Sequence, residues 1–140
     1  MKKYPYLLYV LFILFPAFHY SQIKSDSLTN EKPWPKNMTI ESFKLATNKS
    51  DHLVWVNFSA DWCVVCKKQK PILNELMAEN GKSIELIELD MKDNPLIAAY
   101  FEVDGLPVNL LYKNGTMVWD RMGLISKKEM ENILKIFEIK

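Results

Sequence analysis

The chain contains two cysteines, Cys63 and Cys66, separated by two residues. Thiols at this spacing can close into a small disulfide and reopen, whereas a structural bridge stabilises mainly by closing a long loop. A zinc site needs four ligands, and only His19 and His52 could supplement the pair with imidazoles. The two cysteines therefore predict a redox couple, and no metal site is expected.

Cys63 is predicted to be the attacking cysteine. It follows an apolar run, Leu53–Ser59, that is typical of a strand buried on both faces, and it precedes a helical stretch. At a helix start, unpaired backbone N–H groups and the positive end of the helix dipole stabilise a thiolate, which is the form that attacks disulfides. Cys66 lies one turn further in, where burial favours the neutral thiol. We therefore expect Cys63 to form a mixed disulfide with a partner and Cys66 to resolve it.

The remaining pattern predicts an α/β fold with a central mixed β-sheet flanked by helices on both faces. A second buried strand is expected over 84–90, and Asn114-Gly115 between two apolar runs is a strong hairpin signal. Helices are predicted after Thr39, from the cysteine motif to Asn80, over 95–101 and after the capping box Ser126–Glu129. Parallel crossovers combined with one hairpin imply a mixed sheet between two helical layers.

The N-terminus predicts export. Lys2-Lys3 precedes an apolar run over 6–15 and then small and polar residues, so we interpret 1–21 as a secretory signal peptide. The run is short for a transmembrane helix, but the cleavage site is poor, so an uncleaved membrane anchor is the alternative. Residues 22–38 are predicted to be a linker and 39–140 the folded domain. We expect a periplasmic or secreted bacterial protein, or one anchored to the membrane and facing the periplasm, where disulfides persist.

Length and charge narrow the function classes further. A chain of 140 residues fits one domain with a real core. Its net charge of +1 gives no indication of a nucleic-acid partner or an anionic membrane surface. We expect a monomer without a cofactor, and contact with a membrane only if the N-terminal segment is retained.

Several motifs together resemble the thioredoxin superfamily. Residues 60–67, Ala-Asp-Trp-Cys-Val-Val-Cys-Lys, resemble its active-site segment, and Pro71 matches the proline that the family carries inside the following helix. Residues 105–107 match its Gly-Ile-Pro segment, 110–115 its hairpin, and Gly123 a glycine near its last helix. The resemblance covers roughly residues 38–140. It implies a thioredoxin fold and the activity of a protein thiol-disulfide oxidoreductase.

The resemblance also implies roles for residues outside the cysteine pair. Pro107 is expected to be cis and to face the disulfide formed by Cys63 and Cys66. The backbone of Leu106 is expected to pair with an incoming peptide in the manner of a β-strand, and Trp62 to belong to the partner-contact surface. The implied partners are protein or small-molecule disulfides and dithiols, together with an upstream thiol-disulfide electron donor.

Two residues behind the motif depart from the family pattern. The family has a buried Asp and a Lys where this chain has Asn57 and Glu88. The Asp is thought to handle the proton of the second cysteine, and the amide of Asn57 cannot do so because it does not titrate. We hypothesise that Glu88 acts as proton acceptor for Cys66; the alternative is a purely structural role.

The residues between the cysteines bear on the direction of electron flow. Cys-Val-Val-Cys is similar to the Cys-Val-Ala-Cys of the C-terminal thioredoxin-like domain of the periplasmic thiol:disulfide interchange reductase, and Ala60-Asp61-Trp62 is also shared. No His lies between the cysteines to stabilise a thiolate, which argues against a strong oxidant. A reductant or electron relay is therefore the first interpretation. The alternatives are a disulfide oxidase or isomerase, and a non-catalytic module that binds partners through a thioredoxin fold.

Overall fold

The computed structural model describes residues 35–137, which form four helices and four strands. The elements are α1 (Ile40–Thr47), β1 (Leu53–Ser59), α2 (Val64–Asn80), β2 (Ile84–Asp90), α3 (Pro95–Tyr100), β3 (Val108–Lys113), β4 (Thr116–Met122) and α4 (Lys127–Phe137). The predicted signal peptide and the linker up to residue 34 lie outside the described residues. Within 35–137, no helix is long and apolar enough to cross a membrane.

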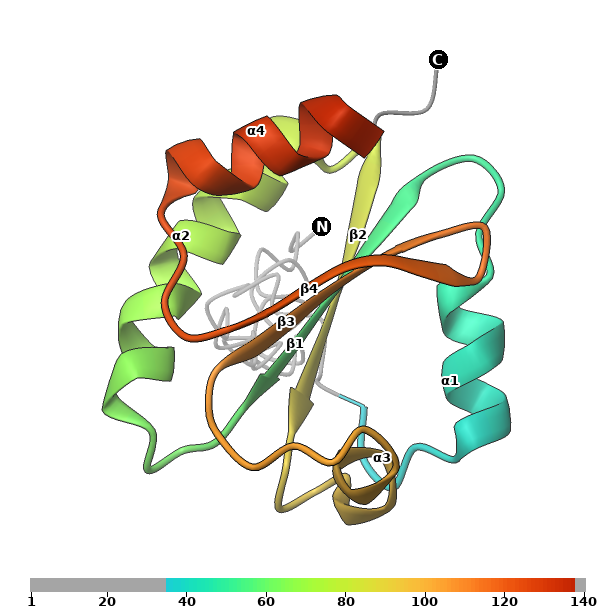
Figure 1. The fold of residues 1–140 in the computed structure, drawn as a ribbon, viewed down its shortest axis with the longest axis vertical. Helices are drawn as coiled ribbons and strands as arrows, with labels where there is room; N and C mark the ends of the chain where they lie inside the picture. Colours follow the sequence, from blue (N-terminus) through green and yellow to red (C-terminus); the bar gives the residue numbers. More distant parts are fainter. Residues whose placement is uncertain (1–34, 138–140) are drawn as a thin grey trace, which may run out of the picture. The chain divides into compact units, whose positions relative to one another are not determined.

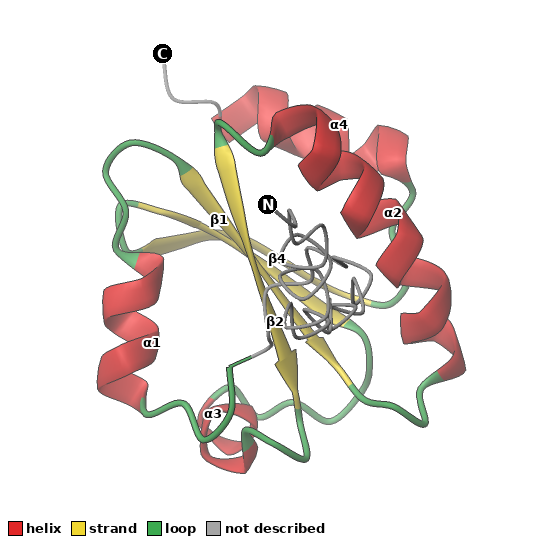
Figure 2. Cartoon of the chain, turned by 180° about the vertical axis from the view of Figure 1, so that it is seen from behind, coloured by secondary structure: helices red, strands yellow, loops and turns green. Residues whose placement is uncertain are grey.

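The strands form one mixed sheet in the order β2-β1-β3-β4. The β1–β2 pair is parallel, and the β1–β3 and β3–β4 pairs are antiparallel. Helices α1 and α3 cover one face and α2 and α4 cover the other, as Figures 1 and 2 show from opposite sides. The predicted α/β fold, with a mixed sheet between helices, is therefore confirmed.

The central strand β1 is buried along its whole length. Successive side chains of a strand point to opposite faces, so β1 contributes to two separate apolar clusters. The first cluster joins its Val54, Val56 and Phe58 to α1 and α3, and the second joins its Leu53 and Trp55 to α2 and α4. This double burial explains why the sequence of β1 shows no alternation of polar and apolar residues.

The chain is already tied to the domain before α1 begins. The Asn37 backbone N–H donates to the carbonyl of Asp93 at 2.8 Å, and the Asn94 side chain donates to the carbonyl of Pro35 at 2.8 Å. Thr39 then caps α1, with its hydroxyl accepting from the Ser42 backbone N–H. Residues 35–38, placed at the end of the predicted linker, thus lie against the connection from β2 to α3.

The β3–β4 hairpin turns on Asn114 and Gly115, which both have positive φ, 52° and 75°. Two consecutive left-handed residues are what a two-residue hairpin turn of the right twist requires, and Asn-Gly adopts them at little cost. The turn brings β4 alongside β3 as an exposed edge strand. The hairpin expected from the sequence is therefore present.

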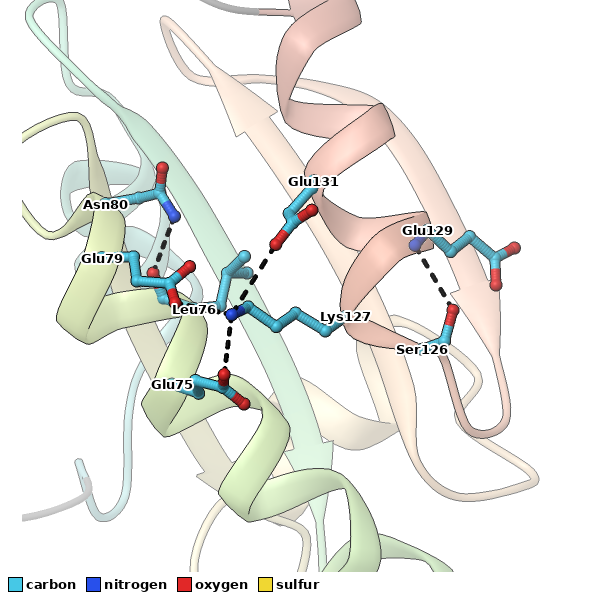
Figure 3. A network of polar contacts seen from close by, with 8 residues as sticks. All are labelled: Glu75, Leu76, Glu79, Asn80, Ser126, Lys127, Glu129 and Glu131. Carbon is cyan, nitrogen blue, oxygen red and sulfur yellow. Dashed lines mark hydrogen bonds and ion pairs between the residues drawn. The ribbon is translucent and has the colours of Figure 1, made fainter.

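Helix α4 is tied to α2 through Lys127 (Figure 3). Its ammonium lies 2.7 Å from a carboxylate oxygen of Glu75 and 2.6 Å from one of Glu79, with Glu131 at 3.8 Å. The hydrogen bonds to Glu75 and Glu79 hold the pKa of Lys127 above its usual range. Apolar contacts of Met130 and Ile133 with the α2 side of the sheet complete the packing of α4.

Tyr112 gives a test of the packing in the α1 cluster. Burial, with the charge of Tyr100 as a second cause, raises the pKa of Tyr112 to about 12 from 10.0. The neutral phenol therefore stabilises the folded state fully below pH 10, and this contribution falls as the pH rises from 10 to about 12. We expect wild type to lose about 2 kcal/mol more than Tyr112→Phe over this range. Urea unfolding at a series of alkaline pH values measures it, and parallel pH dependences of the two proteins would contradict it.

Candidate functional site

Cys63 and Cys66 form a disulfide at the start of α2, with their Cα atoms 5.2 Å apart. Strand β1 ends at Ser59, and the Cys63 backbone N–H donates to the carbonyl of Ala60 at 3.0 Å, which closes the turn into the helix. Cys63 is the N-cap of α2, and its sulfur accepts a hydrogen bond from the Cys66 backbone N–H at 3.0 Å. The buried strand thus delivers this sulfur to the electropositive end of a helix.

The two sulfurs lie in an apolar setting. Cys63 and Cys66 are each 6% exposed, and they cluster with Ala60 and Leu106. Because their burial is equal, burial does not distinguish the two cysteines. The difference between them is position in the helix: Cys63 caps it and Cys66 lies in its first turn. The capping position supports the assignment of Cys63 as the residue whose thiolate is stabilised.

An exposed apolar surface surrounds the disulfide on the helix side. Trp62 is 75% exposed, and Val64 and Val65 are exposed as well. Large apolar side chains left in water are typical of surfaces that bind a partner. Lys67 and Lys68 are exposed further along α2.

The loop before β3 also packs on the disulfide cluster, through Leu106. The Leu106–Pro107 peptide bond is cis, the geometry that the family resemblance implies. Leu106 packs against the cluster of Ala60, Cys63 and Cys66, and the carbonyl of Pro107 accepts from the Gly123 backbone N–H at 2.7 Å. Sequence reasoning placed Trp62, Leu106 and Pro107 around the sulfurs; of these, Leu106 packs against the cluster that contains both cysteines, Pro107 follows it through the cis bond, and Trp62 is the exposed neighbour of Cys63.

A buried row of polar side chains crosses the sheet behind the site. Asn57 pairs in register with Glu88 of β2 and with Asn109 of β3. The side-chain oxygen of Asn109 accepts from the Asn57 amide at 2.9 Å and from the Trp55 indole N–H at 3.1 Å. Glu88 is half-buried beside Asn57, so the two departures from the family pattern lie next to each other.

Two residues of this region were not singled out from the sequence. Asn109 is fully buried in β3, and Gln69 is fully buried in α2, one turn after Cys66. Each is a polar residue at a position that the surrounding apolar pattern assigns to the core. That mismatch was the available signal, because buried polar groups need hydrogen-bond partners.

Metal-ligating side chains are not clustered in the part of the chain that the structure describes. Among residues 35–137, no group of three or more His, Cys, Asp or Glu side chains is placed to hold a metal ion.

Comparison with known proteins places this arrangement in a family. The family model for thioredoxin matches residues 35–136. Thioredoxin of Rickettsia felis is 32% identical over 94 residues, covering 67% of this chain and 90% of that protein. Thioredoxin of Listeria monocytogenes is 30% identical over 99 residues, covering 71% and 94%.

Solved structures agree with the sequence relatives. A structure of thioredoxin-2, described as a component of malaria parasite protein secretion machinery, has a TM-score of 0.61 at 29% identity, covering 64% of this chain and 86% of that one. A chain from work on thiol resolution in yeast mitochondrial 1-Cys peroxiredoxin shares the fold, with a TM-score of 0.65 at 22% identity, covering 74% and 95%. The chain belongs to the thioredoxin family, and Cys63 and Cys66 are its redox pair.

Proposed function

We propose that this protein is a thiol-disulfide reductant or electron relay that works outside the cytoplasm. In each cycle, the Cys63 thiolate attacks a partner disulfide, forms a mixed disulfide and releases one partner sulfur as a thiolate. Cys66 then attacks Cys63, which releases the second partner sulfur and leaves the Cys63–Cys66 disulfide. The pair gives up two electrons, so an upstream dithiol must reduce it again.

The environment of the Cys63 sulfur is the observation that carries the reducing direction. Its observed donor is the Cys66 backbone N–H, and the two intervening side chains are Val64 and Val65, which offer no charge and no hydrogen bond. A pair becomes a strong oxidant when its reduced form is specially stabilised. The helix N-terminus supplies a modest stabilisation here, and no imidazolium adds to it between the cysteines.

The location and the partners follow from other features. The sequence of residues 1–21 supports export, and the exposed surface around Trp62 supports proteins with accessible disulfides as partners. An extended partner segment would pair with the backbone of Leu106. Fractionation of cells that produce the whole chain tests the location, and recovery with the cytoplasmic proteins would contradict it.

The reduction potential tests the direction. Equilibration of the purified protein with glutathione buffers is expected to give a value near that of thioredoxin, about −270 mV, whereas a value near −120 mV would identify an oxidant. An insulin-reduction assay with dithiothreitol as final reductant tests catalysis itself. Absence of turnover by the wild type would favour the non-catalytic binding module.

Glu88 is proposed as the proton acceptor for Cys66. Asn57 cannot titrate, and Glu88 lies beside it in register, half-buried, on the face of the sheet that α2 covers. Its carboxylate would take the Cys66 proton when Cys66 attacks the mixed disulfide.

Glu88→Gln should therefore slow insulin reduction near neutral pH by on the order of tenfold, because a positioned general base is lost. The pH–rate profile should move to higher pH. Glu85→Gln is the matched control. Glu85 lies on the same strand, but its side chain is on the opposite face of the sheet from Glu88, beside His52. An unchanged profile in Glu88→Gln would assign Glu88 a purely structural role.

A further inference from the structure

Gln69 is a polar side chain in the part of α2 that faces the core. It is 0% exposed and lies one turn after Cys66, in the same buried stripe as Leu73 and Leu76. Removing an amide from water without giving it hydrogen-bond partners is strongly unfavourable. The burial of Gln69 is therefore explained by the hydrogen bonds that its amide makes.

The Gln69 amide binds the main chain of Ile125 in both directions. The Ile125 backbone N–H donates to Gln69 Oε1 at 2.8 Å, and Gln69 Nε2 donates to the Ile125 carbonyl at 3.2 Å. The two bonds have the same donor–acceptor pattern as a hydrogen-bonded residue pair between antiparallel strands. It fixes the segment between β4 and α4 to the helix that carries both cysteines.

The segment held by Gln69 reaches the active-site loop. The Gly123 backbone N–H donates to the Pro107 carbonyl at 2.7 Å, and the Met122 side chain lies against Gly105, where a Cβ atom would come 2.6 Å from its sulfur. Met122 and Leu124 are both exposed. We call residues 122–125 the wall segment.

The loop of Gly105–Pro107 therefore has a neighbour on each side. Leu106 packs on the cysteines, and the residues before and after it contact the wall segment. Exposed apolar side chains come from the helix side, at Trp62 and Val64, and from the wall segment, at Met122 and Leu124. Gln69 joins these two surfaces by hydrogen bonds that do not pass through the loop itself.

We propose that Gln69 is a positioning residue for partner binding. It sets the spacing between the cysteine turn and the wall segment, so that an extended apolar segment of a disulfide-bonded protein, paired with Leu106, contacts both surfaces at once. This assignment rests on the proposed function, since it concerns protein partners of the same disulfide. A small disulfide that reaches only the sulfur gains nothing from the spacing.

Gln69→Met tests the assignment, because it keeps the length of the side chain and removes both hydrogen bonds. We expect the KM for insulin to rise about tenfold, equivalent to about 1.4 kcal/mol of binding, with kcat within about twofold. The rate at which the reduced protein reacts with dithionitrobenzoate, a small aromatic disulfide, should stay within about twofold as well.

Two further variants separate positioning from stability. Thr47→Val removes another buried hydrogen-bonding group, from α1 on the opposite face, and should lower stability without changing KM. Leu124→Ser changes an exposed residue of the wall segment and should raise the KM for insulin without lowering stability. In the double variant with Gln69→Met, the fold-increase in KM should be smaller than the product of the two single fold-increases, because both variants act on one surface.

The outcomes are distinct. If the wild type turns over insulin but the KM is unchanged in Gln69→Met or in Leu124→Ser, this assignment is wrong and the proposed function stands. Equal losses with insulin and with dithionitrobenzoate in Gln69→Met also overturn it, since they indicate damage to the sulfur pair. A wild type without insulin turnover overturns both.

Discussion

Cys63→Ser is expected to reduce insulin turnover to the background rate, whereas Cys66→Ser is expected to stop after the first half of the reaction. A serine hydroxyl at position 63 cannot form the mixed disulfide, so the first step is lost completely. With Cys63 intact and Cys66 replaced, attack still occurs and the partner remains bound to Cys63. Intact mass and a non-reducing gel distinguish the free protein from the trapped one.

This pair of variants tests the order of events as well as the need for both sulfurs. The cysteines are equally buried, so the order depends on the capping position of Cys63 and on the hydrogen bond from Cys66. If Cys63→Ser instead accumulates the mixed disulfide and Cys66→Ser does not, the roles are reversed. Turnover that survives in Cys63→Ser would remove the basis of the mechanism.

Asn109→Leu is expected to cause a large loss of stability, because it removes an acceptor that two buried donors share. The Asn109 oxygen accepts from both the Trp55 indole and the Asn57 amide, and its amide donates to the Gly123 carbonyl at 3.4 Å. A leucine would leave both donors without an acceptor, each at a cost of about 1–3 kcal/mol. We expect the free energy of unfolding to fall by about 4 kcal/mol, measured by urea denaturation.

A double variant provides the control for Asn109. Asn57→Val removes one of the orphaned donors, and removal of both partners of a hydrogen bond is much less costly than removal of one. Asn57→Val combined with Asn109→Leu should therefore recover part of the loss. A fall of less than about 1 kcal/mol in Asn109→Leu alone would show that the network contributes little.

The sequence predicted the elements that have strong local signals. The strand over 84–90 has the expected bounds, since Ile84, Leu86, Ile87 and Leu89 supply apolar side chains to both faces, and the hairpin forms because Asn114-Gly115 takes positive φ at both positions. The cysteines and Pro107 were found because the family resemblance includes the motifs that carry them. These features depend on short stretches of chain.

The buried polar contacts depend on partners far away in the chain. Gln69 and Ile125 are 56 positions apart, and Asn57 and Asn109 are 52 apart. A single sequence shows such residues only as polar exceptions in apolar surroundings, and it does not show which group satisfies them. Spatial register supplies that information. Glu88 could be placed behind the motif in advance because the family resemblance marks its position, whereas Gln69 and Asn109 could not be given roles.

The complete burial of β1 has a consequence for how the protein is made. Its partners β2 and β3 follow it in the chain, and the acceptor of the Trp55 indole hydrogen bond, Asn109, is synthesised 54 positions later. Until then, a run of β-branched and aromatic residues without charge stays open to other chains, as aggregation-prone segments do. The strand that delivers the redox sulfur is thus also a segment that needs protection from other chains while the rest of the domain is synthesised.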